Sequence, residues 1–492
     1  MSYSIMIQGT MSSVGKSFLS TALCRIFRQD GYSTAPFKSQ NMALNSFITP
    51  DGCEIGRAQA LQAQASGIEP SPLMNPILLK PSSDMGSQVI VNGKVYGNMS
   101  AREYFRCKRD FIPCIMDSFN KLSEQYDIIV IEGAGSPVEL NLKKDDIVNM
   151  GLAELVKSPV LLAGDIDRGG IFAQMIGTLS LLEPHERNMV KGLAVNRFRG
   201  DISLFSDGVS ILEEKSGKPV VGVVPCIDCN IEDEDSLSEK ILPSDCNGTV
   251  DIAVIKLTRM SNFTDFDVFR QYSGVSLRFV SVPSSLGTPD LIIIPGTKST
   301  IADMKWLRKS GMESAVKELV SKGTAVFGIC GGYQILGTEI SDPYGSESFG
   351  STEGMGLLDC KTVFGTQKKQ CRVTGKFCET DGFFSCLSGA EFYGYEVHMG
   401  TTKGSTLPLT SCGGSFSKNV AGCYVHGIFD SAEVSGRLVK KLFSLKGIEY
   451  SGTFSDRNEY REEQIDMIAD IVRKSMDMEL VYRIIEEYAQ FS

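Results

Sequence analysis

The stretch "SYSIMIQGTMSSVGKS", residues 2–17, decides how the first part of the chain folds. An apolar run ends at Gly9, a serine-rich turn follows, and an amphipathic stretch begins at Lys16. A strand, a tight loop and a helix in this order are what a phosphate-binding loop requires. In such a loop Gly9 and Gly15 allow backbone N–H groups to meet phosphate oxygens. Lys16 adds a positive charge and Ser17 an oxygen ligand for Mg²⁺, so the stretch predicts an ATP site.

The loop departs by one residue from the common spacing G-x-x-x-x-G-K-S, because Thr10 stands where the first glycine would fall. A turn that only caps a helix is therefore an alternative interpretation. Two acidic residues favour the phosphate loop, since Glu132 ends the apolar run "IIVIE" and Asp165 ends "VLLAGD". Acidic groups at strand ends beside such a loop commonly hold the metal directly or through water.

The composition excludes several classes of protein. The chain has 492 residues, 42% hydrophobic and 22% charged, as in an ordinary globular protein of two or three domains. A net charge of −10 without a basic cluster argues against a nucleic-acid partner. No apolar run approaches the roughly 18 residues of a membrane span, and the N-terminus lacks the basic start of a secretory signal. We therefore expect a cytoplasmic protein without a membrane partner.

The 14 cysteines are scattered along the chain, as reduced cytosolic cysteines are, and do not indicate disulfides. Cys226 and Cys229 form a single C-x-x-C, but no second pair follows, and the chain has only three histidines. A zinc site needs four suitable ligands at matching spacings, so we expect none at this pair.

Apolar runs alternate with helical stretches along residues 1–235, which we expect to form one domain. Most of the runs end in Gly, Asp, Asn or Pro, as in "DIIVIEGAGS", "SPVLLAGDIDRGG", "KGLAVNRF" and "KPVVGVVP". Continuous apolar runs of this length fit strands buried on both faces of a parallel sheet. The alternation predicts a doubly wound α/β domain with ligands at the carboxyl ends of its strands. The acidic, polar segment 229–248 is expected to be a linker or an exposed segment.

A second series of strands predicts a second α/β domain over residues 250–436. The series includes "VDIAVIKL", "VSLRFV", "PDLIIIPG", "TAVFGICGG", "EFYGYEVHMGTT" and "NVAGCYVHGIFD". Residues 437–492 are expected to form a C-terminal helical extension, because apolar residues recur there at helical spacing from about residue 455 on. The predicted fold is therefore two doubly wound α/β domains followed by C-terminal helices.

The quoted motifs resemble those of known families. The loop "GTMSSVGKS" with "EGAGS" is similar to the dethiobiotin synthetase-like branch of P-loop proteins, which activates carboxylates with ATP. The stretches "KSQNMALNSFITPDGCEIGRAQALQAQA", "MNPILLKP", "DIDRGGIFA" and "NRFRGD" resemble signatures of the cobyric acid synthase family, along nearly the whole chain. The resemblance implies that Lys38 lies near the transferred phosphate and Asn196 reads the adenine. It also implies metal contacts from Ser17 and Glu132, with Asp51 as a further candidate.

The stretch "FGICGGYQILG" places a cysteine between an apolar run and a helix. A helix N-terminus favours the thiolate of Cys330, and Gly331 and Gly332 let backbone N–H groups approach an oxyanion. The stretch resembles the nucleophile elbow of triad-type, class I glutamine amidotransferases. The same resemblance implies that Gly296 belongs to the oxyanion-side loop and that His426 is the base. A buried structural cysteine near a histidine is the alternative interpretation.

The second domain departs from the usual triad at one position. That triad has a glutamate two residues after the histidine, but position 428 is Ile. The corrinoid amidotransferases likewise lack this glutamate, so the resemblance implies a Cys–His dyad. His398, in "GYEVHMGTT", is either a satisfied structural histidine or a substrate contact.

These resemblances imply an ATP- and glutamine-dependent ligase. ATP would activate a carboxylate, and Cys330 would release ammonia from glutamine through a thioester. The cobyric acid synthase family amidates the b, d, e and g side-chain carboxylates of adenosylcobyrinic acid a,c-diamide in cobalamin biosynthesis. A cobyrinic acid a,c-diamide synthase, a non-catalytic P-loop ATPase switch of the chromosome-partitioning type and a peptidoglycan-linked amidotransferase are the alternatives. The sequence leaves open the order of amidations, the corrin contacts, the ammonia route and whether the chain forms a homo-oligomer.

Overall fold

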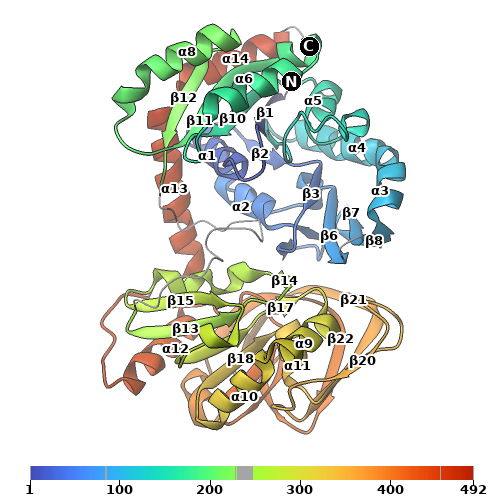
Figure 1. Cartoon of the computed structure of the whole chain (residues 1–492), viewed down its shortest axis with the longest axis vertical. Coiled ribbons are helices and arrows are strands. Elements are labelled where there is room, and N and C mark those ends of the chain that lie inside the picture. The colour runs from blue at the N-terminus through green and yellow to red at the C-terminus, as the bar shows by residue number, and fades with distance from the viewer. Residues whose placement is uncertain (1, 84–85, 228, 230–247, 455, 491–492) are drawn as a thin grey trace.

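The computed structural model describes residues 2–83, 86–227, 229, 248–454 and 456–490. It contains two α/β domains, one above the other in Figure 1, each built around its own central sheet. The expected linker, 229–248, lies almost entirely outside the described residues. Within the part of the chain that is described, no helix is long and apolar enough to cross a membrane.

Six parallel strands in the order β12-β11-β10-β1-β9-β2 form the central sheet of the first domain. They are β1 (Tyr3–Gly9), β2 (Thr34–Phe37), β9 (Ile128–Glu132), β10 (Val160–Asp165), β11 (Val190–Phe198) and β12 (Val220–Pro225). Their apolar side chains are nearly all buried, because helices cover both faces of a parallel sheet. The predicted doubly wound fold is confirmed for this domain.

Two layers of helices enclose this sheet. The helices are α1 (Lys16–Gln29), α2 (Arg57–Ser66), α3 (Ala101–Cys107), α4 (Ile112–Ser123), α5 (Met150–Val156), α6 (Ile171–Leu181), α7 (Pro184–Met189) and α8 (Ser206–Ser216). Apolar residues of α4, α5 and α6 form one core with the sheet, and those of α1 form a second core on the other face. The phosphate loop connects β1 to α1, between the two layers.

Two small sheets extend the first domain beyond its central sheet. One has the order β3-β6-β7-β8, and the other is the hairpin β4-β5. Their strands are β3 (Gln40–Met42), β4 (Ser46–Ile48), β5 (Glu54–Gly56), β6 (Ile77–Ser83), β7 (Gly86–Val91) and β8 (Lys94–Ser100). In Figure 1, β3 and β6 lie on the side of the first domain that faces the second. Of these strands, β4 contacts the second domain directly.

The second domain has a seven-stranded central sheet in the order β15-β13-β16-β18-β25-β24-β23, of which the first five strands are parallel. The strands are β13 (Val250–Ile255), β15 (Val275–Val280), β16 (Leu291–Ile294), β18 (Ala325–Ile329), β23 (Leu407–Thr410), β24 (Gly413–Ser417) and β25 (Val420–Cys423). Its helices are α9 (Thr300–Ser310), α10 (Met312–Ser321), α11 (Gly331–Leu336) and α12 (Ala432–Leu445). This parallel core confirms the second predicted α/β domain.

The stretch "EFYGYEVHMGTT" lies outside this central sheet. It belongs to β22 (Glu391–Gly404), in a separate sheet of order β20-β19-β21-β22, with β19 (Glu339–Asp342), β20 (Gly350–Glu353) and β21 (Cys360–Lys376). β21 and β22 form a long antiparallel pair, and both are partly exposed, as strands covered on one face are. A short pair, β14 (Met260–Ser261) with β17 (Gly296–Thr297), and the 3₁₀ segment η6 (Phe263–Gln271) complete the region near the first domain.

The last two helices return to the first domain. α13 (Arg457–Ser475) runs beside α1, and α14 (Met478–Gln490) packs near β1 and β12, as the red ribbon of Figure 1 shows. Ile465, Ile468 and Val472 join the same apolar core as α1. By contrast, α12 packs against the second domain. The expected boundary between residues 436 and 437 therefore falls inside a helix of that domain.

Candidate active sites

The loop between β1 and α1 has the shape of a phosphate cradle. Its backbone is left-handed at Ser13 (φ 59°) and Gly15 (φ 94°), which turns successive N–H groups toward a common centre. A Cβ atom at Gly15 would lie 2.0 Å from Nδ2 of Asn196, so only glycine fits. Asn196 Nδ2 also donates a hydrogen bond to the carbonyl of Val14 (2.8 Å). The asparagine expected to read adenine thus lies against the loop and supports it.

A buried carboxylate, that of Glu132 at the end of β9, joins several of the predicted residues. It accepts hydrogen bonds from Ser17 Oγ (2.8 Å), Lys38 Nζ (2.9 Å) and Gln62 Nε2 (2.6 Å). Burial acts to raise the pKa of Glu132, but Lys38 and the hydrogen bonds outweigh it and hold the pKa below its usual value. Lys16 Nζ lies above the loop and donates to carbonyl oxygens of the backbone, including that of Met11 (3.0 Å). The group offers two ammonium ions and hard oxygen ligands, as a Mg²⁺–nucleotide site needs.

Three other predicted residues surround the loop. Gly9 ends β1, and the N–H of Thr10 donates to the carbonyl of Ala163 on β10 (2.9 Å), which ties the loop to the neighbouring strand. Asp165, two residues further on, is buried and accepts a hydrogen bond from Arg197 Nη1 (3.1 Å). Asp165 is therefore close to the loop, although its carboxylate already has a cationic partner.

Asp51 stands apart from this group. It lies in the turn between β4 and β5, where its carboxylate accepts a hydrogen bond from the Thr49 side chain. A Cβ atom at the next residue, Gly52, would lie 3.5 Å from the carbonyl of Gln370 in the second domain. None of the described contacts joins Asp51 to Lys16 or Glu132, and the structure places it at the domain interface.

Cys330 occupies a strained turn between β18 and α11. Its backbone angles are φ 51° and ψ −107°, although it is not glycine, and its N–H is bonded to the carbonyl of Cys423 (2.8 Å). Strain of this kind persists only where the surrounding structure enforces it, and it is frequent at active sites. The turn places the thiol at the N-terminus of α11 and in a cavity that His426 also lines. Cys330 and His426 are therefore brought together, as the resemblance implies.

Glycines surround the thiol closely. A Cβ atom at Gly331 would lie 2.9 Å from the backbone nitrogen of Thr297, and one at Gly332 would lie 1.9 Å from the carbonyl oxygen of Ile294. At Gly296 a Cβ atom would lie 3.0 Å from Cε1 of His426. Because side chains are excluded, backbone N–H groups can approach a developing oxyanion at this position.

His426 has a carboxylate partner that the sequence reading missed. Its Nδ1 lies 2.7 Å from Oδ2 of Asp265, in η6, and Asp265 Oδ1 accepts a hydrogen bond from the N–H of Gly427 (3.2 Å). Both side chains are 1% exposed. Burial lowers the pKa of His426, but the Asp265 carboxylate and the Cys330 thiolate outweigh it and raise the pKa to about 10. The arrangement is a Cys–His–Asp triad whose acid lies 161 positions before the histidine in sequence.

The first domain contributes to the surroundings of this triad. Asn262 lies beside His426 (Nδ2 to Nδ1, 3.3 Å), and its Oδ1 accepts a hydrogen bond from the backbone N–H of Ser46 (2.9 Å). Ser46 also accepts one from Tyr395, whose ring stacks on His426 at 5.3 Å. Lys80 of the first domain lines the same cavity as Cys330. The thiol site is therefore completed by residues of the nucleotide domain.

A buried ion-pair cluster joins the two domains next to this cavity. Glu54, fully buried on β5, binds Lys80 of its own domain (2.6 Å) and Lys368 of the second domain. It also accepts a hydrogen bond from Gln370 (2.7 Å). Burial acts to raise the pKa of Glu54, but the two lysines outweigh it and hold the pKa well below its usual range. The carboxylate is therefore ionised, and its ion pairs with Lys80 and Lys368 hold the two domains together.

His398 lines the cavity but has partners at both ring nitrogens. Nδ1 lies 2.8 Å from the carbonyl of Gly400, and Nε2 lies 3.2 Å from Oε2 of Glu396. The ring stacks on Tyr424, with centroids 3.7 Å apart. Its environment is that of a structural histidine in the wall of the site, and a role in substrate binding stays a prediction.

Asp265 and Gln62 could have been suspected from the sequence only in part. Asp265 lies in "SNFTDFD", where two acidic residues sit among apolar ones, but nothing in that spacing relates them to a histidine so far away. Gln62 lies in the quoted stretch "GRAQALQAQA", whose three glutamines would be unusual for an apolar helix buried on all sides. That polarity is a signal of a buried polar site.

Comparison with known proteins agrees with both halves of this description. Residues 5–236 match the CobQ/CobB/MinD/ParA nucleotide binding domain, and residues 251–434 match the CobB/CobQ-like glutamine amidotransferase domain. Curated cobyric acid synthases are similar over the whole chain. One from Lachnoclostridium phytofermentans is 51% identical over 99% of this chain and 100% of its own length. One from Ruminiclostridium cellulolyticum is 51% identical over 98% of this chain and 97% of its own length.

Proposed function

The chain belongs to the cobyric acid synthase family, and from this membership we propose that it converts adenosylcobyrinic acid a,c-diamide to adenosylcobyric acid. It is a glutamine-hydrolysing ligase that amidates corrinoid carboxylates in cobalamin biosynthesis, with ATP as the activating substrate. The finer assignment, to the b, d, e and g carboxylates in successive reactions, is part of the proposal. The same holds for the residue roles below.

The second domain supplies the nitrogen. The Cys330 thiolate attacks the side-chain amide carbon of glutamine, and backbone N–H groups at Gly296 and Gly331 stabilise the oxyanion. His426 gives its proton to the departing nitrogen, which leaves as ammonia, and a thioester remains on Cys330. His426 then takes a proton from a water molecule that hydrolyses the thioester to glutamate. Asp265 keeps the imidazole oriented and stabilises its protonated form.

The first domain activates the carboxylate. A corrinoid carboxylate oxygen attacks the γ-phosphorus of ATP, so that ADP leaves and an acyl phosphate forms. Lys16 and Lys38 neutralise the charge that develops on the transferred phosphoryl group. Ser17 and Glu132, whose oxygens lie 2.8 Å apart, would hold Mg²⁺, and the ion would supply further positive charge to the phosphates. Ammonia then forms the C–N bond, inorganic phosphate leaves, and the nitrogen loses one proton.

The cavity beside Cys330 supports this function most. Its wall includes Lys80 of the nucleotide domain, and Asn262 at its edge is bonded to Ser46 of the same domain. A free-standing glutaminase or a nucleotide switch has no need of such a shared site. An enzyme that passes ammonia from one domain to the other does.

The experiment is incubation with ATP, glutamine and adenosylcobyrinic acid a,c-diamide, followed by mass spectrometry of the corrinoid. Successive losses of about one mass unit, each an OH replaced by NH₂, are expected, ending after four. Cys330→Ala should lose glutamine-dependent synthesis, because no thioester can form, and regain it with an ammonium salt at a pH where free NH₃ exists. Amidation of cobyrinic acid instead of its a,c-diamide would favour the a,c-diamide synthase. An unmodified corrinoid with either nitrogen source would overturn the proposal.

A further inference from the structure

One segment of the first domain reaches from the phosphate site to the thiol site. Lys38 follows β2 and binds Glu132, whereas Ser46 binds Asn262 beside His426. The segment from Lys38 to Ser46 spans at most about 29 Å, at 3.3–3.6 Å per residue. This length is an upper limit for the straight-line separation of these two contacts. The side chains along β3 and the paired strand β6 therefore decide what ammonia would meet between the two sites.

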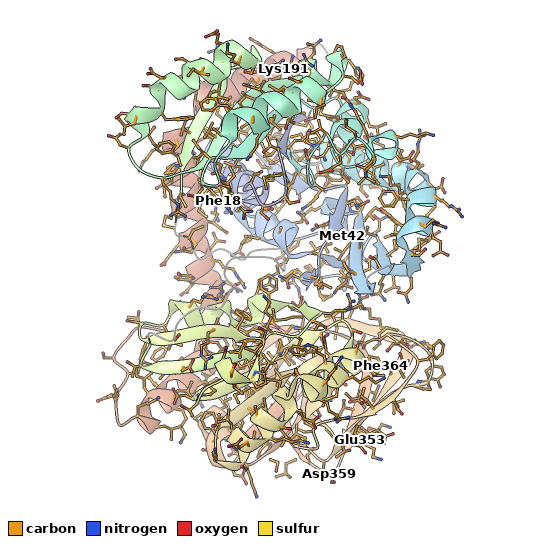
Figure 2. The ribbon with its side chains drawn as sticks, in the orientation of Figure 1. Phe18, Met42, Lys191, Glu353, Asp359 and Phe364 are labelled. Carbon is orange, nitrogen blue, oxygen red and sulfur yellow. The ribbon has the colours of Figure 1, made fainter. Side chains whose placement is uncertain are left out.

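The buried face of β3, β6 and β7 carries polar and apolar residues side by side. The strand register pairs Asn41 with Leu78 and Leu78 with Ile90, so these three side chains lie side by side on one face. Lys80 and Gln88, paired in the same way, lie two residues further along that face. Met42 belongs to the opposite face and is 58% exposed; Figure 2 shows it in the first domain and Phe364, from the wall of the thiol cavity, in the second.

The outer end of this face opens on the thiol site. Lys80 is one of the residues that line the cavity of Cys330, and its Nζ binds Glu54 (2.6 Å) and Ser46 Oγ (2.9 Å). Gln88 accepts hydrogen bonds from Lys298 and Lys368 of the second domain, both at 3.2 Å. Ammonia released at the thiol thus meets a polar entrance made by both domains.

Apolar residues lie on the same face, next to this entrance. Ala43, Leu78 and Ile90 form an apolar cluster of their own, separate from the large cores of the domain, and all three are buried. We call these three residues the neck. An ammonium ion would lose its hydration there without compensation, whereas neutral ammonia would lose much less. The neck therefore favours the species that can act as a nucleophile.

Asn41, which lies beside Leu78, connects this face to the surroundings of Glu132. Asn41 Nδ2 donates to Gln59 Oε1 (2.9 Å), and Gln62, three residues further along α2, donates to Glu132 (2.6 Å). Both glutamines are 0% exposed. Within the described residues, Gln59 Nε2 and Gln62 Oε1 have no hydrogen-bond partner. The carboxylate accepts only, so Gln62 has to present its NH₂ group to Glu132 and its oxygen is left over.

These two orphan atoms are complementary to ammonia. Gln59 offers an N–H donor for the lone pair of ammonia, and Gln62 offers an acceptor oxygen for one of its N–H groups. Buried polar atoms without partners are rare in native proteins and call for an explanation such as a small polar guest. An ammonia molecule bound here would lie beside the carboxylate that Ser17 and Lys38 contact.

We propose that ammonia released at Cys330 travels along this face, from Lys80 through the neck to Gln59 and Gln62. The inference rests on the proposed function and adds to it the residues that carry the nitrogen between the two reactions. Ammonia leaves glutamine as NH₃, crosses the neck without a proton, and attacks the acyl carbon as phosphate departs. No further reactant is needed.

The test compares Leu78→Phe with Leu79→Phe. These neighbouring leucines on β6 are both buried, but Leu78 belongs to the neck and Leu79 to the large core on the opposite face. Each enzyme is given glutamine labelled with ¹⁵N in its side-chain amide, an excess of unlabelled ammonium salt, ATP and the corrinoid. Mass spectrometry then measures the share of ¹⁵N in the new amides, which does not depend on the overall rate. Glutamate release is measured in parallel.

Leu78→Phe should release glutamate at a rate within about twofold of wild type, while the ¹⁵N share of the product falls at least threefold. Leu79→Phe should keep the wild-type share. An unchanged share in Leu78→Phe, or an equal fall in both variants, would overturn the route. If thermal melting shows that Leu78→Phe does not fold, Ala43→Val takes its place with the same two outcomes. Failure of the proposed function is distinguishable, because wild type would then form no amide with either nitrogen source.

Discussion

Replacing Asp265 by Asn changes one oxygen of a buried triad and tests whether this carboxylate directs the glutaminase. The variant keeps the size of the side chain but removes its charge. Asp265 Oδ1 accepts the N–H of Gly427, and Oδ2 faces Nδ1 of His426. In the variant the single amide oxygen is needed by Gly427, so the NH₂ group faces His426 Nδ1. That nitrogen then has to be an acceptor, which moves the imidazole proton to Nε2, on the side that should receive a proton from the thiol.

The size of the effect follows from the lost interaction. A hydrogen bond to a charged group contributes about 1.5–3 kcal/mol, which corresponds to roughly a 10- to 150-fold change in rate. Because the tautomer is reversed as well, we expect a loss of glutaminase kcat of about 100-fold or more. The carboxylate and Cys330 together raise the pKa of His426 to about 10, so the variant, which keeps only Cys330, should lose its protonated imidazole at lower pH. The basic limb of the pH–rate profile should therefore move toward neutral pH.

The assay is glutamate release between pH 6 and pH 11, together with ammonium-dependent synthesis. Synthesis with ammonium should be nearly unchanged in Asp265→Asn, since the triad is not used there. Asp267→Asn is the matched control, because Asp267 lies two residues away in η6, is equally buried and binds Arg270 (3.2 Å). If Asp265→Asn keeps wild-type glutaminase and an unshifted basic limb, the site works as a dyad and the role given to Asp265 is wrong.

Three further variants test the phosphate loop, the metal site and the interdomain ion-pair cluster separately. Lys16→Ala should lower synthesis about 10²- to 10³-fold with glutamine or ammonium alike, because the transferred phosphoryl charge is no longer compensated; rescue by ammonium would contradict the phosphate role. Glu132→Gln should raise the Mg²⁺ concentration for half-maximal synthesis at least about tenfold, and an unchanged titration would move the metal role to Asp165. Glu54→Gln leaves Lys80 and Lys368 without their carboxylate and should cost about 3–5 kcal/mol of unfolding free energy at pH 7, measured in urea. Since the folded pKa of Glu54 is lowered, its stabilisation should fade as the pH drops below the unfolded value of 4.5, and a pH-independent gap would contradict the ion-pair cluster.

Much of the fold follows from local sequence patterns. Short apolar runs that end at functional groups, as at Glu132 and Asp165, fit buried strands of a parallel sheet. The two domains, the closing helices and the position of the phosphate loop were predictable in this way. The stretch at 391–402 was not, because an apolar, partly alternating run does not reveal which sheet it joins.

The site residues that could be predicted are likewise those with a local sequence pattern. Residues within one loop, such as Lys16 with Ser17 or Cys330 with Gly331, could be named because their spacing carries the chemistry. Asp265 could not, since it meets His426 only through the packing of η6 against the loop that follows β25, and long-range pairing has no local signature. Asp51 shows the reverse case, because an acidic residue in a conspicuous stretch folds away to the domain interface.

The return of α13 to the first domain has a consequence for how the protein is made. The first sheet is complete in sequence at Pro225, but the face covered by α1 stays unfinished until Ile465, Ile468 and Val472 have been synthesised. At 5–20 residues per second a ribosome needs roughly 10 to 50 s for the intervening stretch of about 240 residues. Throughout that interval the part of this core that α13 covers is exposed to chaperones and to other nascent chains. The second domain is therefore synthesised, and can fold, before the first domain is complete.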